Sequence, residues 1–351
     1  MAPQLHGFCL TSLSESRGLA SAVARHANVP LIPLEERRFE GGEFKLRPLE
    51  SVRGRTVFVL QSLAGSDEMP VCERLVRLLF LLQGLRDVGA AATVALMPYL
   101  AFARKDRRTQ PRDPVTSRYA AELLEASGVS QVVALDVHNP AAFDNAFRIP
   151  TVHLTAVPIM VDHFARVAAE ATDTGRIGMP RPAAVTIVSP DVGGIKRAQL
   201  FREQLAARTG LAVDLAFVEK RRAKGIVTTG VLAGEVAGRM VIVLDDLCAT
   251  GGTLIRAAEA CAIGGAAAVH VAVTHTPLAN GVEALLARNE ISRIVATDSV
   301  GFAFAAARAP TAPPGKLITL ATAPLFGETV RRMIAAEPLS PLLERWPLPV
   351  S

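Results

Sequence analysis

The segment 243–253 holds the densest group of residues that could do chemistry. Its sequence, VLDDLCATGGT, places Asp245 and Asp246 directly after an apolar run, and Thr250 and Thr253 on either side of two glycines. Glycines let a backbone approach a ligand closely, and the amides at the start of a helix bind phosphate. The carboxylates can accept hydrogen bonds from sugar hydroxyls. A plain strand-to-helix turn explains fewer of these residues, so the segment predicts a sugar-phosphate site.

Three other places combine charged or metal-binding residue types with a strand end. Arg104 and Lys105 begin a basic run, His138 follows Asp136 after an apolar run, and Asp191 precedes two glycines. Each has a simpler interpretation when taken alone. A basic loop is usually a solvated surface, a lone histidine is usually structural, and a Pro/Gly stretch can be an ordinary turn. The interest of these residues depends on their occurring together.

Short apolar runs alternate with helical patterns along the chain, which is typical of an α/β fold with a parallel sheet covered on both faces. In the first half, the expected strands are 6–13, 56–62, 92–99 and 129–136, and the expected helices are 16–27, 67–87 and 115–127. In the second half, the strands are 182–191, 211–220, 239–246, 267–275 and 293–300, and the helices are 194–208 and 252–263. Ligands of such sheets bind at the carboxyl ends of the strands, where the candidate residues fall.

Composition limits the classes of partner. The chain has 351 residues, enough for two domains, and its 38 Lys and Arg exceed its 33 Asp and Glu by only five. This small, dispersed excess argues against a nucleic-acid partner and agrees with a phosphate-bearing substrate. We see no signal peptide and no apolar run of about 20 residues, so no membrane partner is expected. The four cysteines lack metal spacing, as in reduced thiols of a cytoplasmic protein.

The segment from Asp245 to Thr253 resembles the phosphoribosyl-pyrophosphate loop of type I phosphoribosyltransferases and ribose-phosphate pyrophosphokinases. The segments 38–43, 98–108, 134–139, 188–194 and 219–222 resemble the pyrophosphokinases, in the family's order. This resemblance runs from about residue 6 to residue 345. It implies two tandem type I phosphoribosyltransferase-like domains, each a mostly parallel sheet flanked by helices. We expect the N-terminal domain over residues 1–150 and the C-terminal domain, with the ribose-phosphate loop, over residues 151–351.

The resemblance also implies roles for individual residues. The residues expected to bind ATP are Phe39, which would stack on the adenine, and Glu43, Arg104, Lys105 and His138. The residues expected to bind ribose 5-phosphate are Asp245, Asp246, Thr250, Gly251, Gly252 and Thr253. The expected cofactor is Mg²⁺, held by His138 and Asp191. Lys220 and Arg222 are expected to be catalytic, because mobile cations stabilise charge on a transferred phosphoryl-type group.

The activity implied by the resemblance is transfer of the β,γ-diphosphoryl group of ATP to the 1-hydroxyl of ribose 5-phosphate. The products would be phosphoribosyl pyrophosphate and AMP, used in nucleotide biosynthesis. In the family, the turn that corresponds to residues 38–43 reaches the site of a neighbouring subunit. A homo-oligomer assembled from dimers, up to a hexamer, is therefore expected.

Three residues depart from the family pattern. Gly41 stands where Asp is usual, Lys105 where Gln is common, and Ala249 where an Asp usually precedes Thr-Gly-Gly-Thr. Gly41 and Ala249 motivate one alternative, a catalytically silent regulatory member of the family, although the four residues His138, Asp191, Lys220 and Arg222 argue against it. The other alternative is a phosphoribosyltransferase, which consumes the same product.

Overall fold

The computed structural model describes residues 7–66, 68–173, 184–219, 222–223, 226–227, 231–300 and 314–344. These residues fall into two compact units. The first unit contains the described residues of 1–155, 298–302 and 321–339, and the second contains those of 156–297, 303–320 and 340–351. The domains expected from the sequence follow the chain without interruption. The compact units do not, because two C-terminal segments belong with the first unit.

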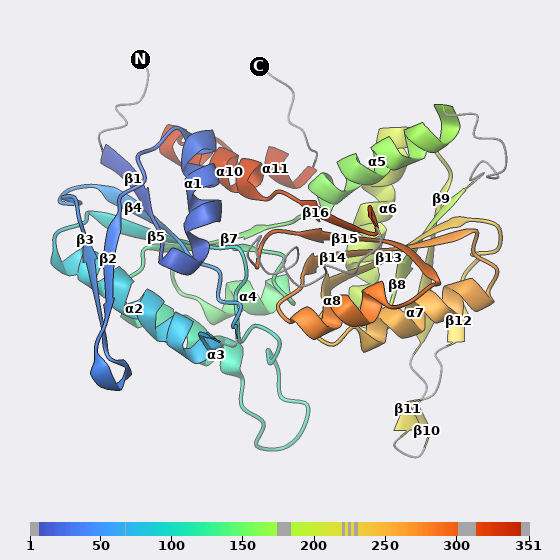
Figure 1. Cartoon of the computed structure of the whole chain (residues 1–351), viewed down its shortest axis with the longest axis horizontal. Coiled ribbons are helices and arrows are strands. Elements are labelled where there is room, and N and C mark those ends of the chain that lie inside the picture. The colour runs from blue at the N-terminus through green and yellow to red at the C-terminus, as the bar shows by residue number, and fades with distance from the viewer. Residues whose placement is uncertain are drawn as a thin grey trace. The chain divides into compact units, whose positions relative to one another are not determined.

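The first unit is built on a five-stranded parallel sheet in the order β1-β4-β5-β6-β7. The strands are β1 (Phe8–Thr11), β4 (Thr56–Leu60), β5 (Ala92–Met97), β6 (Gln131–Leu135) and β7 (Thr151–Leu154). The helices are α1 (Arg17–Ala27), α2 (Val71–Asp87), α3 (Thr116–Ala126), α4 (Pro140–Ala146) and α10 (Ala323–Ala335). Helices α1 and α10 lie over one face of the sheet, and α2, α3 and α4 lie under the other (Figure 1). The α/β character expected of this half is confirmed.

Apolar spacing explains why α2 lies against this sheet. Leu78, Leu82 and Leu85 fall on one side of the helix and are fully buried. They belong to the same core cluster as Val57 of β4 and Ala95 of β5. Apolar residues three and four positions apart form one stripe on a helix, and burial of that stripe fixes the helix on the sheet.

Helix α10 packs on α1, although the two helices are far apart in the sequence. Their contact passes through Gly327 of α10. A Cβ atom at this position would overlap the Cβ atom of His26 and would lie 3.3 Å from the backbone nitrogen of Ala27. The absence of a side chain at Gly327 therefore lets the two helices approach closely.

A β-hairpin outside the main sheet was not expected as such. It consists of β2 (Leu34–Arg38) and β3 (Phe44–Pro48), which pair antiparallel around the turn at 39–43. Arg77 of α2 holds it in place through Glu36 of β2, at 2.5 Å, and also binds Glu15, at 3.0 Å. The Arg77 side chain is 10% exposed and both Glu side chains are 13% exposed. A nearly buried ionic cluster thus joins the hairpin to α2.

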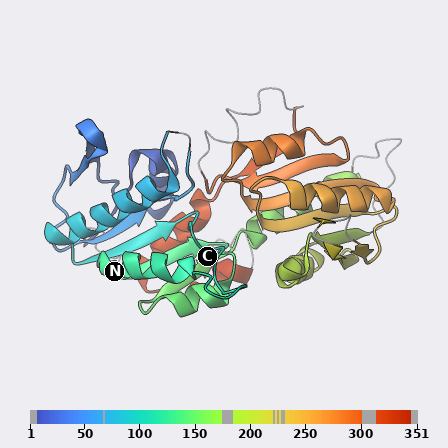
Figure 2. The same cartoon turned by 90° about the horizontal axis from the view of Figure 1, so that it is seen from below.

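The second unit contains a seven-stranded sheet in the order β12-β9-β8-β13-β14-β15-β16. Its strands are β8 (Val185–Ser189), β9 (Val213–Glu219), β12 (Val231–Ala233), β13 (Met240–Leu247), β14 (Ala268–His275), β15 (Ile291–Thr297) and β16 (Leu317–Leu320). Only β12 runs antiparallel to its neighbour. The helices are α5 (Val157–Asp173), α6 (Ile195–Thr209), α7 (Gly252–Ile263), α8 (Ala279–Leu286) and α11 (Pro341–Glu344). Figures 1 and 2 show α7 and α8 on one side of this sheet.

Short elements complete the described chain. They are the 3-10 helices η2 (Ser14–Ser16), η3 (Glu40–Gly42) and η4 (Val192–Gly194), and the antiparallel pair β10 (Arg222–Ala223) and β11 (Ile226–Val227). Among the described residues, no helix is both long enough and apolar enough to cross a bilayer.

A buried histidine in the second unit makes stability depend on pH. His270 of β14 is 6% exposed, and its ring centroid lies 6.0 Å from that of Phe164 on α5. Burial, with smaller contributions from Arg293 and His163, lowers the pKa of His270 from 6.5 to about 4. His270 is therefore protonated at a lower pH in the folded state than in the unfolded state. The stabilisation is complete above pH 6.5 and is lost as pH falls towards 4.

The variant His270→Leu should remove this pH dependence. Between pH 7 and pH 5, the wild type should lose roughly 2 kcal/mol more free energy of unfolding than His270→Leu. Urea unfolding of both proteins at the two pH values measures the difference. Equal losses would show that His270 does not titrate in this way.

Candidate active site

Two acids stand at the carboxyl end of β13. Asp246 is 5% exposed, and its backbone nitrogen donates a hydrogen bond of 2.9 Å to Oδ1 of Asp245. Arg197, from the first turn of α6, lies 3.0 Å from Asp246 Oδ1 and 3.6 Å from Asp245 Oδ1. The structure therefore brings together both acids predicted to bind a sugar and adds a cation that the sequence analysis missed. Arg197 follows the segment 188–194 by three positions, and that proximity was the available signal.

Burial governs the charge of this acid pair. Burial is the largest cause that raises the pKa of Asp245 to about 8, and the neighbouring charge of Asp246 adds to it, while Arg197 opposes it. Burial and mutual repulsion thus favour a proton on Asp245, and the charge that the pair keeps gains from groups that donate hydrogen bonds. The end of β13 is therefore suited to hydroxyl donors of a ligand.

The loop that follows the acids leads directly into α7. The backbone nitrogen of Cys248 donates to the carbonyl of His275 at the end of β14, at 2.8 Å, which ties the loop to the sheet. Gly251 has a φ of 78°, a left-handed conformation that favours glycine, and α7 begins at Gly252. The first amides of a helix have no partner within that helix. Exposed Thr250 and half-buried Thr253 flank this helix start, as predicted.

Arg256 adds positive charge beside the same helix start. It is the fifth residue of α7, and its Nη2 lies 3.5 Å from the hydroxyl of Thr253. A Cβ atom at Gly252 would lie 3.3 Å from Arg256 Nη1, so the guanidinium reaches back over the start of the helix. Cations are unfavourable near a helix N-terminus unless an anion binds there. This is the signal by which the sequence could have revealed Arg256.

Asp191 stands at the end of β8, the strand that pairs with β13. Its Oδ1 accepts the backbone amides of Gly193, at 3.0 Å, and Gly194, at 3.3 Å. The side chain is half-buried and caps η4. Two glycine amides thus fix the orientation of this predicted metal ligand.

The predicted catalytic residues are described only in part. Lys220 lies outside the described residues. The backbone of Arg222 belongs to β10, at the start of the small antiparallel pair. The roles of both residues stay predictions.

In the first unit, Phe39 stands at the tip of the β2–β3 hairpin. Its backbone nitrogen donates to the carbonyl of Glu43, at 2.7 Å, and closes the turn, in which Gly41 has a φ of 82°. The Phe39 ring is 40% exposed, and the Arg37 guanidinium lies 5.0 Å from its centroid. Glycine at position 41 fits the left-handed conformation there, so the departure from the family's Asp has a backbone explanation. The exposed ring face is suited to stacking.

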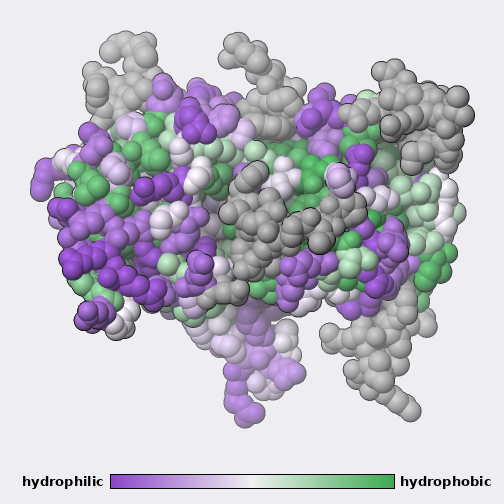
Figure 3. Space-filling view, in the orientation of Figure 1, coloured by the Kyte–Doolittle hydropathy of each residue, from purple (hydrophilic) through white to green (hydrophobic). Residues whose placement is uncertain are grey.

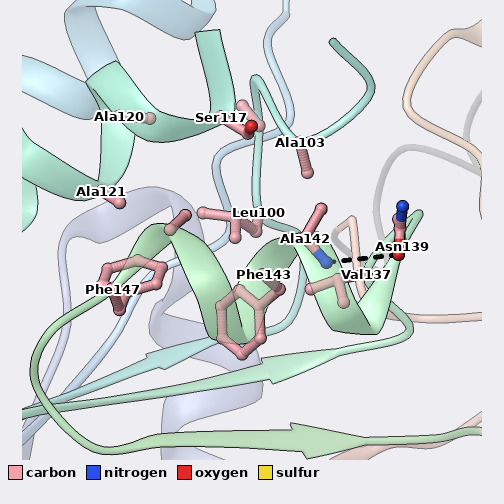
Figure 4. Close-up of a pocket in the computed structure, with 12 residues that line it drawn as sticks. Leu100, Ala103, Ser117, Ala120, Ala121, Val137, Asn139, Ala142, Phe143 and Phe147 are labelled. Atoms are coloured by element: carbon pink, nitrogen blue, oxygen red, sulfur yellow. Dashed lines mark hydrogen bonds between the residues drawn. The ribbon is translucent and has the colours of Figure 1, made fainter. Parts of the chain in front are cut away.

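His138 is exposed just beyond β6, and the next residue, Asn139, is the N-cap of α4. Oδ1 of Asn139 accepts a hydrogen bond of 3.3 Å from the backbone amide of Ala142, as the dashed line in Figure 4 shows. Its Nδ2 donates to Asp106 Oδ2 at 2.6 Å. The basic segment and the strand end that carries His138 are thereby linked. An apolar gap lined in part by Asn139 and Phe143 has a volume of about 10 Å³, room for one water molecule at most.

The basic loop has an internal ion pair that was not predicted. Arg104 is exposed, as expected, whereas the Lys105 ammonium binds Asp113. Asp113 Oδ2 also accepts the amides of Thr109, at 2.9 Å, and Gln110, at 3.0 Å. These contacts, with the hydrogen bond from Lys105 as the largest cause, hold the pKa of Asp113 well below its ordinary value. In the space-filling view the loop is a hydrophilic projection from the lower edge (Figure 3).

Comparisons with known proteins point to one family. The chain matches the model of the N-terminal domain of ribose phosphate pyrophosphokinase over residues 8–128 and that of the phosphoribosyl transferase domain over residues 152–305. It is 36% identical to the ribose-phosphate pyrophosphokinase of Granulibacter bethesdensis over 336 residues, which are 95% of this chain and 99% of the relative. It is 32% identical to that of Bacillus caldolyticus over 340 residues, 97% of this chain and 98% of the relative.

A solved structure gives the same result. The crystal structure of phosphoribosylpyrophosphate synthetase from Mycobacterium smegmatis is similar with a TM-score of 0.79 and 26% sequence identity. The similarity covers 94% of this chain and 99% of that one. Sequence and fold therefore agree over nearly the whole length: the chain belongs to the ribose-phosphate pyrophosphokinase family.

Proposed function

We propose that this protein is a ribose-phosphate pyrophosphokinase, which converts ATP and ribose 5-phosphate to phosphoribosyl pyrophosphate and AMP. The observation that carries the proposal is the end of β13. There, two acids, a glycine with positive φ and the first amides of α7 occur together. They do so in a chain that matches the family over nearly its whole length.

Ribose 5-phosphate is assigned to this part of the second unit. Asp245 and Asp246 accept hydrogen bonds from ribose hydroxyls, beside the guanidinium of Arg197. The 5-phosphate binds the hydroxyls and amides of the loop, that is, of Thr250, Gly251, Gly252 and Thr253.

ATP is assigned to residues of the first unit. Phe39 stacks on the adenine, and Glu43 beside it accepts hydrogen bonds. Arg104 and Lys105 neutralise the charge of the phosphates. To do so, Lys105 leaves its partner Asp113 and binds the triphosphate. His138 donates to a phosphate oxygen or binds the metal ion.

The residues present fit a magnesium ion that is carried largely by substrate phosphates. In the described residues, no group of three or more His, Cys, Asp and Glu could hold a metal ion alone. Mg²⁺ commonly uses only one or two carboxylates, with water and phosphate oxygens completing its shell. Asp191, fixed by two glycine amides, supplies such a carboxylate, with His138 as the second proposed ligand. The ion supplies positive charge that offsets charge on the transferred group.

The reaction is an in-line displacement. The ribose 1-hydroxyl attacks the β-phosphorus of ATP and loses its proton to water. A new oxygen–phosphorus bond forms, and the bond from the β-phosphorus to the α-phosphate oxygen breaks, so that AMP leaves. Lys220 and Arg222 stabilise the charge on the transferred diphosphoryl group.

We also propose a cytoplasmic homo-oligomer built from dimers, up to a hexamer. The exposed Phe39 ring of one copy would then stack on the adenine of ATP bound to a neighbouring copy. Light scattering measures the size of the assembly.

The experiment that tests the function is formation of both products by purified protein. With ATP, ribose 5-phosphate and Mg²⁺, the protein should release AMP and phosphoribosyl pyrophosphate in equal amounts, and chelation of the metal should stop both. A folded sample that binds ATP but releases neither product would favour the silent regulatory member of the family.

The variant Asp246→Asn should chiefly weaken ribose 5-phosphate binding. Hydrogen bonds to a charged group contribute about 1.5–3 kcal/mol, so the KM for ribose 5-phosphate should rise roughly tenfold to a hundredfold. The KM for ATP should stay near the wild-type value. Asp214→Asn is the control, because Asp214 is 54% exposed and pairs with Arg239 on the surface. If only the KM for ATP changed, the assignment of the loop would be wrong.

A further inference from the structure

A glycine that belongs to none of the motifs described above lies against the loop that follows β13. Gly281 is the third residue of α8 and is buried. A Cβ atom at Gly281 would lie 2.9 Å from the carbonyl carbon of Ala249 and closer still to its oxygen. It would also lie 3.2 Å from the sulfur of Cys248. Real Cβ atoms essentially never come within 3.0 Å of such atoms, so any other residue at position 281 forces a displacement.

The contact is reciprocal and involves backbone atoms on both sides. A Cβ atom at Gly251 would lie 3.0 Å from the carbonyl oxygen of Gly281. A clash between a side chain and a backbone cannot be relieved by choosing another rotamer of the neighbour. Alanine is a better helix former than glycine, so the intrinsic preference of α8 does not explain the glycine. The close approach of the loop does.

The loop rather than α8 is the part that can move. Leu285 of α8 is fully buried and Val282 is 5% exposed, which anchors the helix. Leu285 belongs to the same core cluster as Leu254 of α7. Ala249 and Thr250, by contrast, are half-buried and exposed, and they precede the glycine with positive φ. A group added at position 281 would therefore push residues 249–251 away from α8.

We propose that Gly281 is a positioning residue, which sets the place of the 249–251 backbone and so aligns the loop with the phosphate of ribose 5-phosphate. It touches no reacting atom and acts only through the loop. This inference rests on the proposed function. It adds α8 to the sugar-phosphate site, because α8 packs against the loop through Gly281.

The test compares three variants in the full-length protein. Gly281→Ala adds one methyl group against the loop. Val282→Ala removes buried atoms from the next position of α8 and adds none, so it reproduces a loss of stability without pushing the loop. Gly84→Ala lies in the middle of α2, where an added Cβ meets no atom within 4 Å. For each variant we would measure kcat, the KM for ribose 5-phosphate, the KM for ATP, the melting temperature and, by calorimetry without ATP, ribose 5-phosphate binding.

We expect Gly281→Ala to raise the KM and the Kd for ribose 5-phosphate at least tenfold and to leave the KM for ATP within twofold. Val282→Ala should lower the melting temperature with little change in either KM, and Gly84→Ala should resemble the wild type. An unchanged KM for ribose 5-phosphate in Gly281→Ala would overturn the inference. A tenfold rise in Val282→Ala as well would also overturn it, since instability alone would then explain the effect. Absence of product from the wild type would instead contradict the proposed function.

Discussion

Lys220→Ala should lower kcat by two to three orders of magnitude, with the free energy of unfolding close to that of the wild type. A cation that meets charge only as it develops contributes to the transition state more than to substrate binding. Removing one such electrostatic group typically costs about 10²–10³ in kcat. The KM values for ATP and ribose 5-phosphate should therefore change much less than kcat. Steady-state kinetics with each substrate varied in turn provides the measurement.

A matched control separates this effect from general loss of surface charge. Arg166→Ala removes a cation of the second unit that is 67% exposed and pairs with Asp162 one helical turn away on α5. Its kcat should equal that of the wild type. If Lys220→Ala retained full turnover, Lys220 would be removed from the mechanism. A rise in KM alone would make it a substrate-binding residue instead.

Arg77→Met should lower the free energy of unfolding by about 3–5 kcal/mol, because it leaves two nearly buried carboxylates, those of Glu15 and Glu36, without their common cation. Methionine keeps much of the length and apolar character of the side chain, so lost packing is a small part of the effect. The same change releases the hairpin that carries Phe39, so the KM for ATP should rise too. Urea unfolding followed by circular dichroism, together with kinetics, measures both results.

Arg38→Met is the control for Arg77→Met. Arg38 also joins the hairpin to α2, at 3.4 Å from Glu73, but its side chain is 59% exposed. Solvent screens such a pair, and its loss should cost less than about 1 kcal/mol. Equal destabilisation by the two variants would show that burial of the Arg77 cluster is not the reason for its effect.

The main elements were predictable because each carries its own periodic signal. The strand at Met240–Leu247 and the helix at Gly252–Ile263 are where the apolar run and the glycines place them. The β2–β3 hairpin was predicted only as a turn, because it lies outside the main sheet and depends on α2 through Arg77. The membership of α10 in the first unit depends on Gly327 meeting α1, a contact between positions about 300 residues apart. No local pattern encodes it.

The candidate site shows the same division. The places of Asp245, Asp246 and Gly251 in the fold could be predicted, because the apolar run marks the strand and the glycines mark the turn before the helix. Arg197 was missed, because its nearness to the segment 188–194 is a weak signal and the fold is what brings the first turn of α6 to the end of β13. The pairing of Lys105 with Asp113 was missed for a related reason, since it requires the path of the loop between them.

The position of α10 has a consequence for biosynthesis. A ribosome releases Ala323–Ala335 about 300 residues after Arg17–Ala27. In the interval, the buried side of α1 that α10 covers has no partner from its own unit. The nascent first unit must wait through synthesis of the second, and during that time a chaperone or a neighbouring nascent chain could bind the uncovered helix. The first unit is thus begun long before the helix that completes it has been made.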